Sequence, residues 1–114
     1  MGNIGSELDV NDRLPALGAD PNTAVVTGFS AGAYMAHNLH IIYSETFKGA
    51  GLISGGSYHA ESYYPLGGLY VLGKPYERDP EYLAEKGIEH AISNAQQNLI
   101  DPLSNLKDQP VFIQ

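Results

Sequence analysis

Ser30 lies between two glycines in the stretch GFSAG, after an apolar run and before a helical pattern. A serine in G-x-S-x-G between a strand and a helix is typical of a nucleophile elbow, a sharp turn that exposes the hydroxyl. Because the turn is tight, positions 28 and 32 require small residues so that the strand and the helix do not collide, and Gly28 and Gly32 meet this requirement. The pattern predicts Ser30 as a nucleophile and the backbone N–H of Ala31 as a donor to the oxyanion of a tetrahedral intermediate.

The same five residues also fit an ordinary strand-to-helix turn in which the Ser30 hydroxyl only caps the helix. A bare G-x-S-x-G occurs often by chance. The predicted strand and helix on its two sides favour the nucleophile, and Ala33 adds a further small residue after Gly32.

A serine nucleophile needs a base within hydrogen-bond reach, and the four histidines are the first candidates. His37 and His40 lie on the helix that leads away from Ser30, so we expect them on its surface or at an interface. His90 lies among polar residues and is expected in solvent. His59 follows a strand on a loop, at the sheet edge where open α/β sheets bind ligands. It is a candidate for the substrate wall and a weaker candidate for the base.

The aspartates offer no clear acid for such a base. Asp101 is expected in a turn, Asp108 precedes the last strand and so lies at its wrong end, and Asp79 fits a helix N-cap before Pro80. No group of His, Asp and Glu has the spacing of a metal site, and the sequence implies no cofactor.

Strand and helix patterns alternate along the chain. Apolar and β-branched runs predict strands at 24–29, 50–54 and 109–114, and a helical period predicts helices at 31–47 and 81–99. This order with short links predicts an α/β class, a parallel sheet of about three strands with flanking helices. The predicted apolar faces are Met35, Leu39 and Ile42 on the first helix and Ile88, Ile92, Ala95 and Leu99 on the second.

Composition narrows the class of protein. The chain has 114 residues, a net charge of −7 and 43% hydrophobic residues, which favours a packed domain or part of one and argues against a basic nucleic-acid surface. It has no cysteine, and no apolar run approaches the roughly 20 residues of a membrane span. The N-terminus has no apolar signal region, but MGNIGS fits the short pattern for myristoylation of Gly2.

Residues 20–56 closely resemble the nucleophile region of polyhydroxybutyrate depolymerases and related secreted esterases of the α/β-hydrolase fold. The resemblance rests on the DPN turn before the strand, on GFSAG, on YSETF at the end of the helix and on an apolar strand that closes on two glycines. It implies Ser30 as nucleophile, Ala31 as oxyanion donor and a secreted protein. Ala33 stands where many members have glycine. A nucleophile so near the N-terminus also resembles a circularly permuted branch of the family.

The resemblance also implies where the rest of the catalytic triad would come from. In this fold the order along the chain is serine, acid and then histidine, and LKDQPVFIQ looks like the strand that precedes the acid. We therefore expect residues 1–114 to be the nucleophile-bearing portion of one domain, with acid and base supplied by further sequence or by a partner chain.

Aromatic side chains follow Gly55-Gly56 on the predicted active side and are candidates to contact a hydrophobic polyester. They are Tyr58, Tyr63, Tyr64 and Tyr70. Ordinary packing of a long loop is an equally good interpretation.

Two hypotheses from different classes follow. The first is a serine esterase or depolymerase segment that hydrolyses poly(3-hydroxybutyrate)-like polyester or short acyl esters through an acyl-Ser30 intermediate. The second is a non-catalytic hydrolase-like subunit, structural or interacting, without a complete triad. Both need the remainder of the domain or a partner chain, and neither involves nucleic acid.

Overall fold

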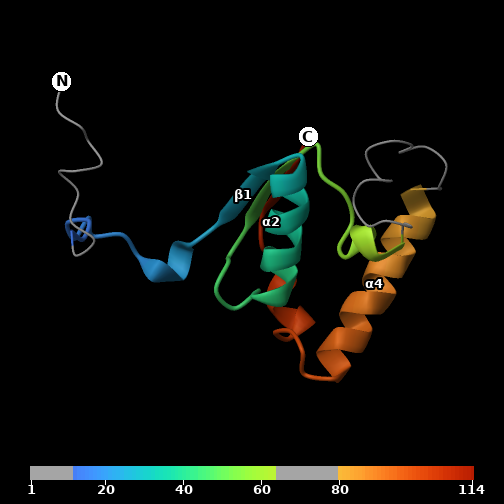
Figure 1. The fold of residues 1–114 in the computed structure, drawn as a ribbon. Coiled ribbons are helices and arrows are strands. Elements are labelled where there is room, and N and C mark those ends of the chain that lie inside the picture. The colour runs from blue at the N-terminus through green and yellow to red at the C-terminus, as the bar shows by residue number, and fades with distance from the viewer. Residues whose placement is uncertain (1–11, 64–79) are drawn as a thin grey trace.

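The computed structural model describes residues 12–63 and 80–114. Within them the chain forms a parallel sheet of three strands in the order β1-β2-β3 (Figure 1). The strands are β1 (Val26–Phe29), β2 (Ala50–Ile53) and β3 (Val111–Ile113). The predicted parallel α/β arrangement is confirmed, with strands one to three residues shorter than expected.

The described residues also form two α-helices and three short 3₁₀ turns, one of which precedes the first strand. The helices are α2 (Ala31–Ile42) and α4 (Pro80–Gln96), and the turns are η1 (Pro21–Thr23), η2 (Ala60–Tyr63) and η3 (Leu103–Leu106). The prediction that the first helix reaches residue 47 is wrong, because Tyr43 leaves the helical conformation at φ −116° and ψ 49°. Turns then follow, with the N–H groups of Thr46 and Phe47 donating to the Tyr43 carbonyl.

The sheet register brings the carboxyl ends of the strands together. Phe29 pairs with Ile53, and Leu52 pairs with Ile113. In Figure 1 these ends meet beside the chain terminus labelled C, where α2 also begins. Residues that follow β1 and β2 therefore lie at one edge.

The core between α2 and the sheet consists of small side chains. Ala33 and Ala36 of α2 are 0% and 2% exposed and pack against Ala50 and Leu52 of β2. The predicted apolar face of this helix is buried only in part, because Met35 is 59% exposed whereas Leu39 and Ile42 are half-buried. Alanines allow the helix backbone to approach the sheet closely, so they form the buried face instead of the larger side chains.

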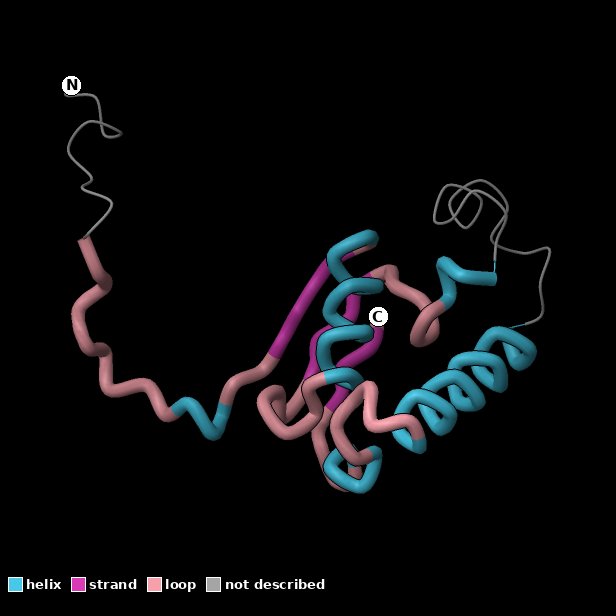
Figure 2. The backbone as a smooth tube through the Cα atoms, turned by 60° about the horizontal axis from the view of Figure 1, so that its bottom comes forward, coloured by secondary structure: helices cyan, strands magenta, loops and turns pink. Residues whose placement is uncertain are grey.

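The helix α4 contacts the rest of the molecule through small residues as well. Its buried residues are Gly87 and Ala91, whereas Ile88 and Leu99 of the predicted stripe are 59% and 64% exposed. A Cβ built on Gly87 would lie 3.0 Å from the Tyr58 carbonyl oxygen, so the helix backbone lies directly against that segment. Figure 2 shows α4 beside α2 and separated from the sheet. The predicted apolar stripe of this helix does not form a core.

A polar network joins the end of α2 to the segment before β3. His40 is 3% exposed, and its Nε2 lies 2.6 Å from Gln109 Oε1. Gln109 Nε2 donates to the carbonyl of buried Ser44 at 2.9 Å. Of the two positions expected for His40, the helix surface or an interface, the structure shows the second: the ring is buried with a hydrogen-bond partner, as buried polar groups generally are.

The face of the sheet opposite α2 is open. Phe29 is 69% exposed, Ile53 is 39% exposed and Phe112 is 60% exposed. These side chains line one shallow depression together with Thr27 and Gly51. The described part of the chain thus presents a continuous apolar surface on this side. None of its helices combines the length and the apolarity that crossing a bilayer requires.

Candidate active site at the carboxyl edge of the sheet

Ser30 occupies a strained backbone position between β1 and α2. Its φ is 54° and its ψ is −120°, values that glycine favours and that L-residues rarely adopt. Its side chain makes no capping hydrogen bond to the helix, although Ser30 stands at the N-cap. A serine at an N-cap ordinarily has an extended backbone, which carries no such strain. The ordinary-cap interpretation therefore does not describe this turn, and the geometry is that of an elbow.

Gly28 is the residue that makes the sharp turn possible. A Cβ at this position would lie 2.1 Å from the Gly32 carbonyl oxygen and 2.6 Å from the Ala33 nitrogen. No side chain fits there, as the sequence predicted. The same expectation for Gly32 is wrong, because a Cβ built on Gly32 meets nothing within 4 Å. The close approach is between the Gly28 α-carbon and the backbone at 32–33, so the restriction falls on one glycine only.

The backbone groups of Ser30 are hydrogen-bonded, whereas the N–H of the next residue, Ala31, has no acceptor within the helix. The Ser30 N–H donates to the Ile53 carbonyl at 2.8 Å, which extends the β1–β2 pairing to the elbow. The Ser30 carbonyl accepts from the N–H groups of Ala33 and Tyr34, the first bonds of the helix. Ala31 is the first residue of α2, so the helix itself supplies no acceptor for its N–H. That N–H is available to an oxyanion at a helix N-terminus, where negative charge is favoured.

The segment after β2 lies beside the elbow. Ser54 has a φ of 55°, and its N–H donates to the Gln114 carbonyl at 2.7 Å. Gly55 follows and passes so close to α2 that a Cβ there would lie 2.7 Å from Ala33 Cβ. The His37 ring holds the next residue, with Nδ1 2.8 Å from the Gly56 carbonyl oxygen. His37, expected on the helix surface or at an interface, is half-buried at the interface between α2 and this segment.

The recorded hydrogen bonds of three histidines do not reach Ser30. His37 bonds Gly56, His40 bonds Gln109, and His59 Nδ1 lies 2.7 Å from Ser62 Oγ. The structure therefore gives no support to His59 as a base for Ser30. Within the described residues, these rings serve the packing of loops and helices.

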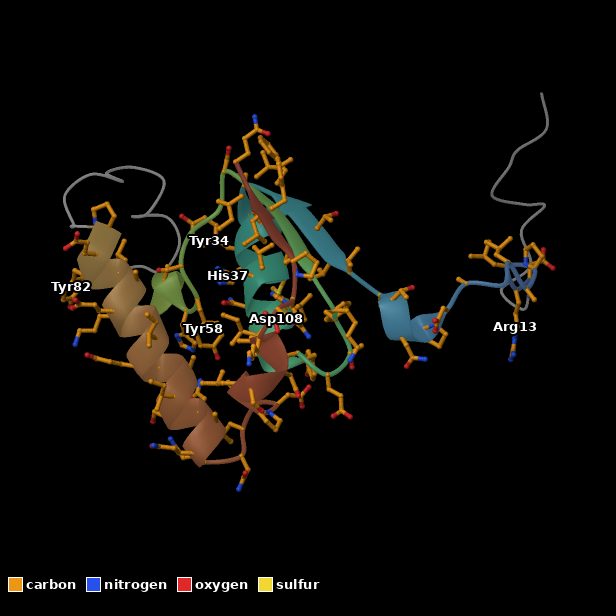
Figure 3. The ribbon with its side chains drawn as sticks, turned by 180° about the vertical axis from the view of Figure 1, so that it is seen from behind. Arg13, Tyr34, His37, Tyr58, Tyr82 and Asp108 are labelled. Carbon is orange, nitrogen blue, oxygen red and sulfur yellow. The ribbon has the colours of Figure 1, made fainter. Side chains whose placement is uncertain are left out.

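Tyr58 and His59, the candidate wall residues, hold α4 in place. Tyr58 is 3% exposed, and its hydroxyl accepts from Asn94 Nδ2 at 3.0 Å. The His59 ring stacks on the His90 ring with centroids 4.3 Å apart. The expectation that His90 is solvated is wrong, since it is half-buried in this stack. Figure 3 shows Tyr58 between α2 and α4.

The remaining candidates have simple positions. Asp101 lies in the connection after α4, where its N–H donates to the Ile42 carbonyl and its Oδ2 accepts from the Glu45 N–H. Asp108 lies before β3, near the far end of α2 from the elbow (Figure 3), as predicted. Asp79, Tyr64, Tyr70 and the side chain of Tyr63 lie outside the described residues, as does Gly2.

Sequence patterns missed three parts of this edge: Ile53, Gly55 and His37. The Gly55-Gly56 pair carried a signal, since adjacent glycines often mark close backbone approach. The hydrogen bond between His37 and Gly56 had no local signal, because it joins residues from different elements.

Comparison with known proteins finds two curated relatives. The chain is 32% identical over 103 residues, 89% of its length, to a poly(3-hydroxybutyrate) depolymerase of Delftia acidovorans, covering 20% of that protein. It is 46% identical over 56 residues, 48% of its length, to a polyhydroxybutyrate depolymerase of Talaromyces funiculosus, covering 16% of that protein. The chain thus spans a fifth or less of the relatives it matches. No family model matches, and no solved structure matches. The two relatives support the resemblance of this chain to the polyhydroxybutyrate depolymerase family.

Proposed function

We propose that these 114 residues carry the nucleophile of a serine ester hydrolase that acts on poly(3-hydroxybutyrate)-like polyester or on short acyl esters. The observation that carries the proposal is the backbone of Ser30 at φ 54° and ψ −120°, on a strand-to-helix turn where Gly28 admits no side chain. Strain of this kind costs about 1–3 kcal/mol and is typical of functional sites. The names of the two relatives supply the substrate class.

In the proposed reaction Ser30 Oγ gives its proton to a base as it attacks the ester carbonyl carbon. The alcohol takes that proton as its bond to the carbonyl carbon breaks, and it leaves. The acyl group remains on Ser30 until water attacks the same carbon and releases the acid. The Ala31 N–H donates to the oxyanion in both steps, a kind of interaction worth about 3–4 kcal/mol per donor.

Activation of Ser30 requires a base and an acid from outside the described residues. The rings of His37, His40 and His59 are committed to Gly56, Gln109 and Ser62. We propose that the remainder of the protein or a partner chain brings a histidine to the carboxyl edge of the sheet. The open side of the elbow at Ala31 leaves that edge accessible.

Replacement of the nucleophile tests this function. We expect Ser30→Ala in the full-length protein to lower kcat for p-nitrophenyl butyrate by about 10⁴-fold or more. The melting temperature should not fall, because the change removes only the Ser30 hydroxyl, which makes no capping hydrogen bond to the helix. Ser104→Ala, the same change at an exposed serine of η3, is the matched control and should keep full activity. An active Ser30→Ala variant with a normal melting temperature would remove Ser30 from the mechanism.

The second candidate is a non-catalytic subunit of the same architecture. The open apolar face formed by Phe29, Ile53 and Phe112 favours it, since such a face fits association with another surface. The two candidates differ in the Ser30→Ala result. A subunit of this kind would lose nothing when Ser30 is replaced, whereas the esterase would lose its activity.

A further inference from the structure

We propose that His37 is a positioning residue of the candidate active site. Its Nδ1–H holds the Gly56 carbonyl and so fixes the rim segment, residues 54–57, as the wall of the site on the β2 side. This inference rests on the proposed function. It assigns to His37 a part in substrate fit and not in the attack itself.

The rim segment is adjacent to the nucleophile through the backbone. The Ile53 carbonyl accepts from the Ser30 N–H at 2.8 Å, and Ser54 follows immediately. The Ser54 N–H in turn donates to the Gln114 carbonyl at 2.7 Å, which fixes the first residue of the rim segment to the end of β3. An ester that reaches Ser30 Oγ from the β2 side must therefore pass this segment.

The rim segment lies directly on the first turns of α2. A Cβ on Gly55 would lie 2.7 Å from Ala33 Cβ, and a Cβ on Gly56 would lie 2.3 Å from Tyr34 Cε1. Ala33 is 0% exposed and has no room to move. The same helix turn carries the Ala31 N–H at its start, so a shift of the rim segment changes the space next to the oxyanion donor.

One hydrogen bond ties the centre of the rim segment to α2. His37 Nδ1 lies 2.8 Å from the Gly56 carbonyl oxygen and so joins the middle of the rim segment to α2. A carbonyl only accepts, so Nδ1 carries the proton whether the ring is neutral or charged. Figure 3 shows Tyr34 and His37 one above the other on the side of α2 that faces this loop.

The hydrogen bond from His37 matters for the conformation of the rim segment, because two adjacent glycines lie there. Gly55 and Gly56 have no Cβ, so their backbone explores more conformations than that of other residues once it is released. Loss of the His37 donor should therefore leave Ser54 fixed by Gln114 while Gly55 and Gly56 become disordered. The expected kinetic consequence is weaker binding of the substrate with little change in the chemical step.

The experiment compares His37→Asn with His37→Leu in the full-length protein. Asparagine places an amide N–H where the histidine has Nδ1. Leucine is branched at the same carbon as asparagine but has no donor. For p-nitrophenyl butyrate we expect His37→Leu to raise KM by about tenfold, the effect of about 1.4 kcal/mol and the upper range for one hydrogen bond. His37→Asn should stay within about threefold of the unchanged protein, and kcat should change little in both variants.

Hydrogen exchange of the backbone provides a readout without activity. Amides of residues 55–58 should exchange faster in His37→Leu and at the normal rate in His37→Asn. Equal defects in both variants would mean that ring packing matters and the donor does not, which overturns the proposal. Normal KM and exchange in His37→Leu would overturn it as well.

Two further outcomes distinguish a failure of this proposal from a folding defect and from a failure of the proposed function. If His37→Leu does not fold, His37→Gln replaces it, because its amide lies at the Nε2 position and supplies no donor at Nδ1. It should then show the raised KM and the faster exchange. If Ser30→Ala keeps its activity, the proposed function fails, and the exchange rates alone decide whether His37 fixes the rim segment.

Discussion

At the scale of single residues, the elbow depends on one contact between backbone atoms. The α-carbon of Gly28 faces the carbonyl of Gly32 so closely that a methyl group would lie 2.1 Å from its oxygen. Backbone atoms of a helix start cannot yield as the end of a flexible side chain can. The sharp turn at Ser30 thus depends on a hydrogen atom in place of a side chain at position 28.

A pair of alanine substitutions tests this contact. We expect Gly28→Ala to lower the free energy of unfolding by about 3 kcal/mol or more, because overpacking next to rigid backbone is costly. Gly32→Ala introduces the same methyl group where nothing lies within 4 Å, and it should change the stability by less than about 1 kcal/mol. Denaturant unfolding of both variants measures the difference. Equal losses would mean that the elbow is more open than the structure describes.

Residue types predicted the sharp strand-to-helix turn at Ser30 but not the contacts around it. Ser30 and Gly28 belong to a motif whose residues are adjacent in sequence, so local spacing carries the information. The partners of His40 and His37 were not predicted, because each ring bonds a residue from a distant element, Gln109 and Gly56. A helical pattern gives the direction of a side chain but does not show which loop covers it.

At the scale of elements, a side-chain amide joins α2 to the approach of β3. Gln109 contacts both the His40 ring and the Ser44 carbonyl, and both of these residues are buried. Because one amide satisfies two groups, its loss leaves a donor and an acceptor without partners. The position of β3 in the sheet therefore depends on a polar contact outside the sheet.

Substitution of Gln109 tests this link. We expect Gln109→Leu to lower the free energy of unfolding by about 2 kcal/mol, since each buried group left without a partner costs about 1–3 kcal/mol. Gln97→Leu, at an exposed position directly after α4, is the matched control, with a change within about 0.5 kcal/mol. Thermal unfolding monitored by circular dichroism compares the two. A Gln109→Leu variant as stable as Gln97→Leu would show that His40 and Ser44 find other partners.

The order and direction of the elements were predictable, but their buried faces were not. Alternation of strands and helices with short links allows few arrangements, and the parallel sheet is one of them. Large apolar residues marked the expected faces of both helices, yet Met35 and Ile88 are each 59% exposed. The contacts go through Ala33, Ala36 and Gly87, because the closest approach of a helix to its neighbour selects small side chains.

At the scale of the whole molecule, one side of the sheet is covered and the other is not. The helix α2 covers one face, and Phe29, Ile53 and Phe112 remain exposed on the other. The edge strand β3 has three exposed residues. Exposed edges and apolar faces promote association between chains.

We expect the isolated chain of 114 residues to self-associate through this face. Phe112→Lys should shift it toward the monomer in sedimentation velocity runs at micromolar concentration. Leu14→Lys changes the net charge equally, and Leu14 is 88% exposed and distant from the sheet, so this control should leave association unchanged. A chain that is already monomeric without substitution would contradict the expectation, and so would equal effects of both variants.

The connections between strands also set an order of assembly. The link from β1 to β2 consists of α2 and short turns, whereas the link from β2 to β3 includes η2, α4 and η3. Contacts across shorter loops form sooner, because less chain entropy is lost on closure. We therefore expect the β1–α2–β2 unit, with the turn at Ser30 inside it, to fold before β3 docks. In that order Ser54 would receive its partner Gln114 only at the later step, so the turn at Ser30 would form before its rim is complete.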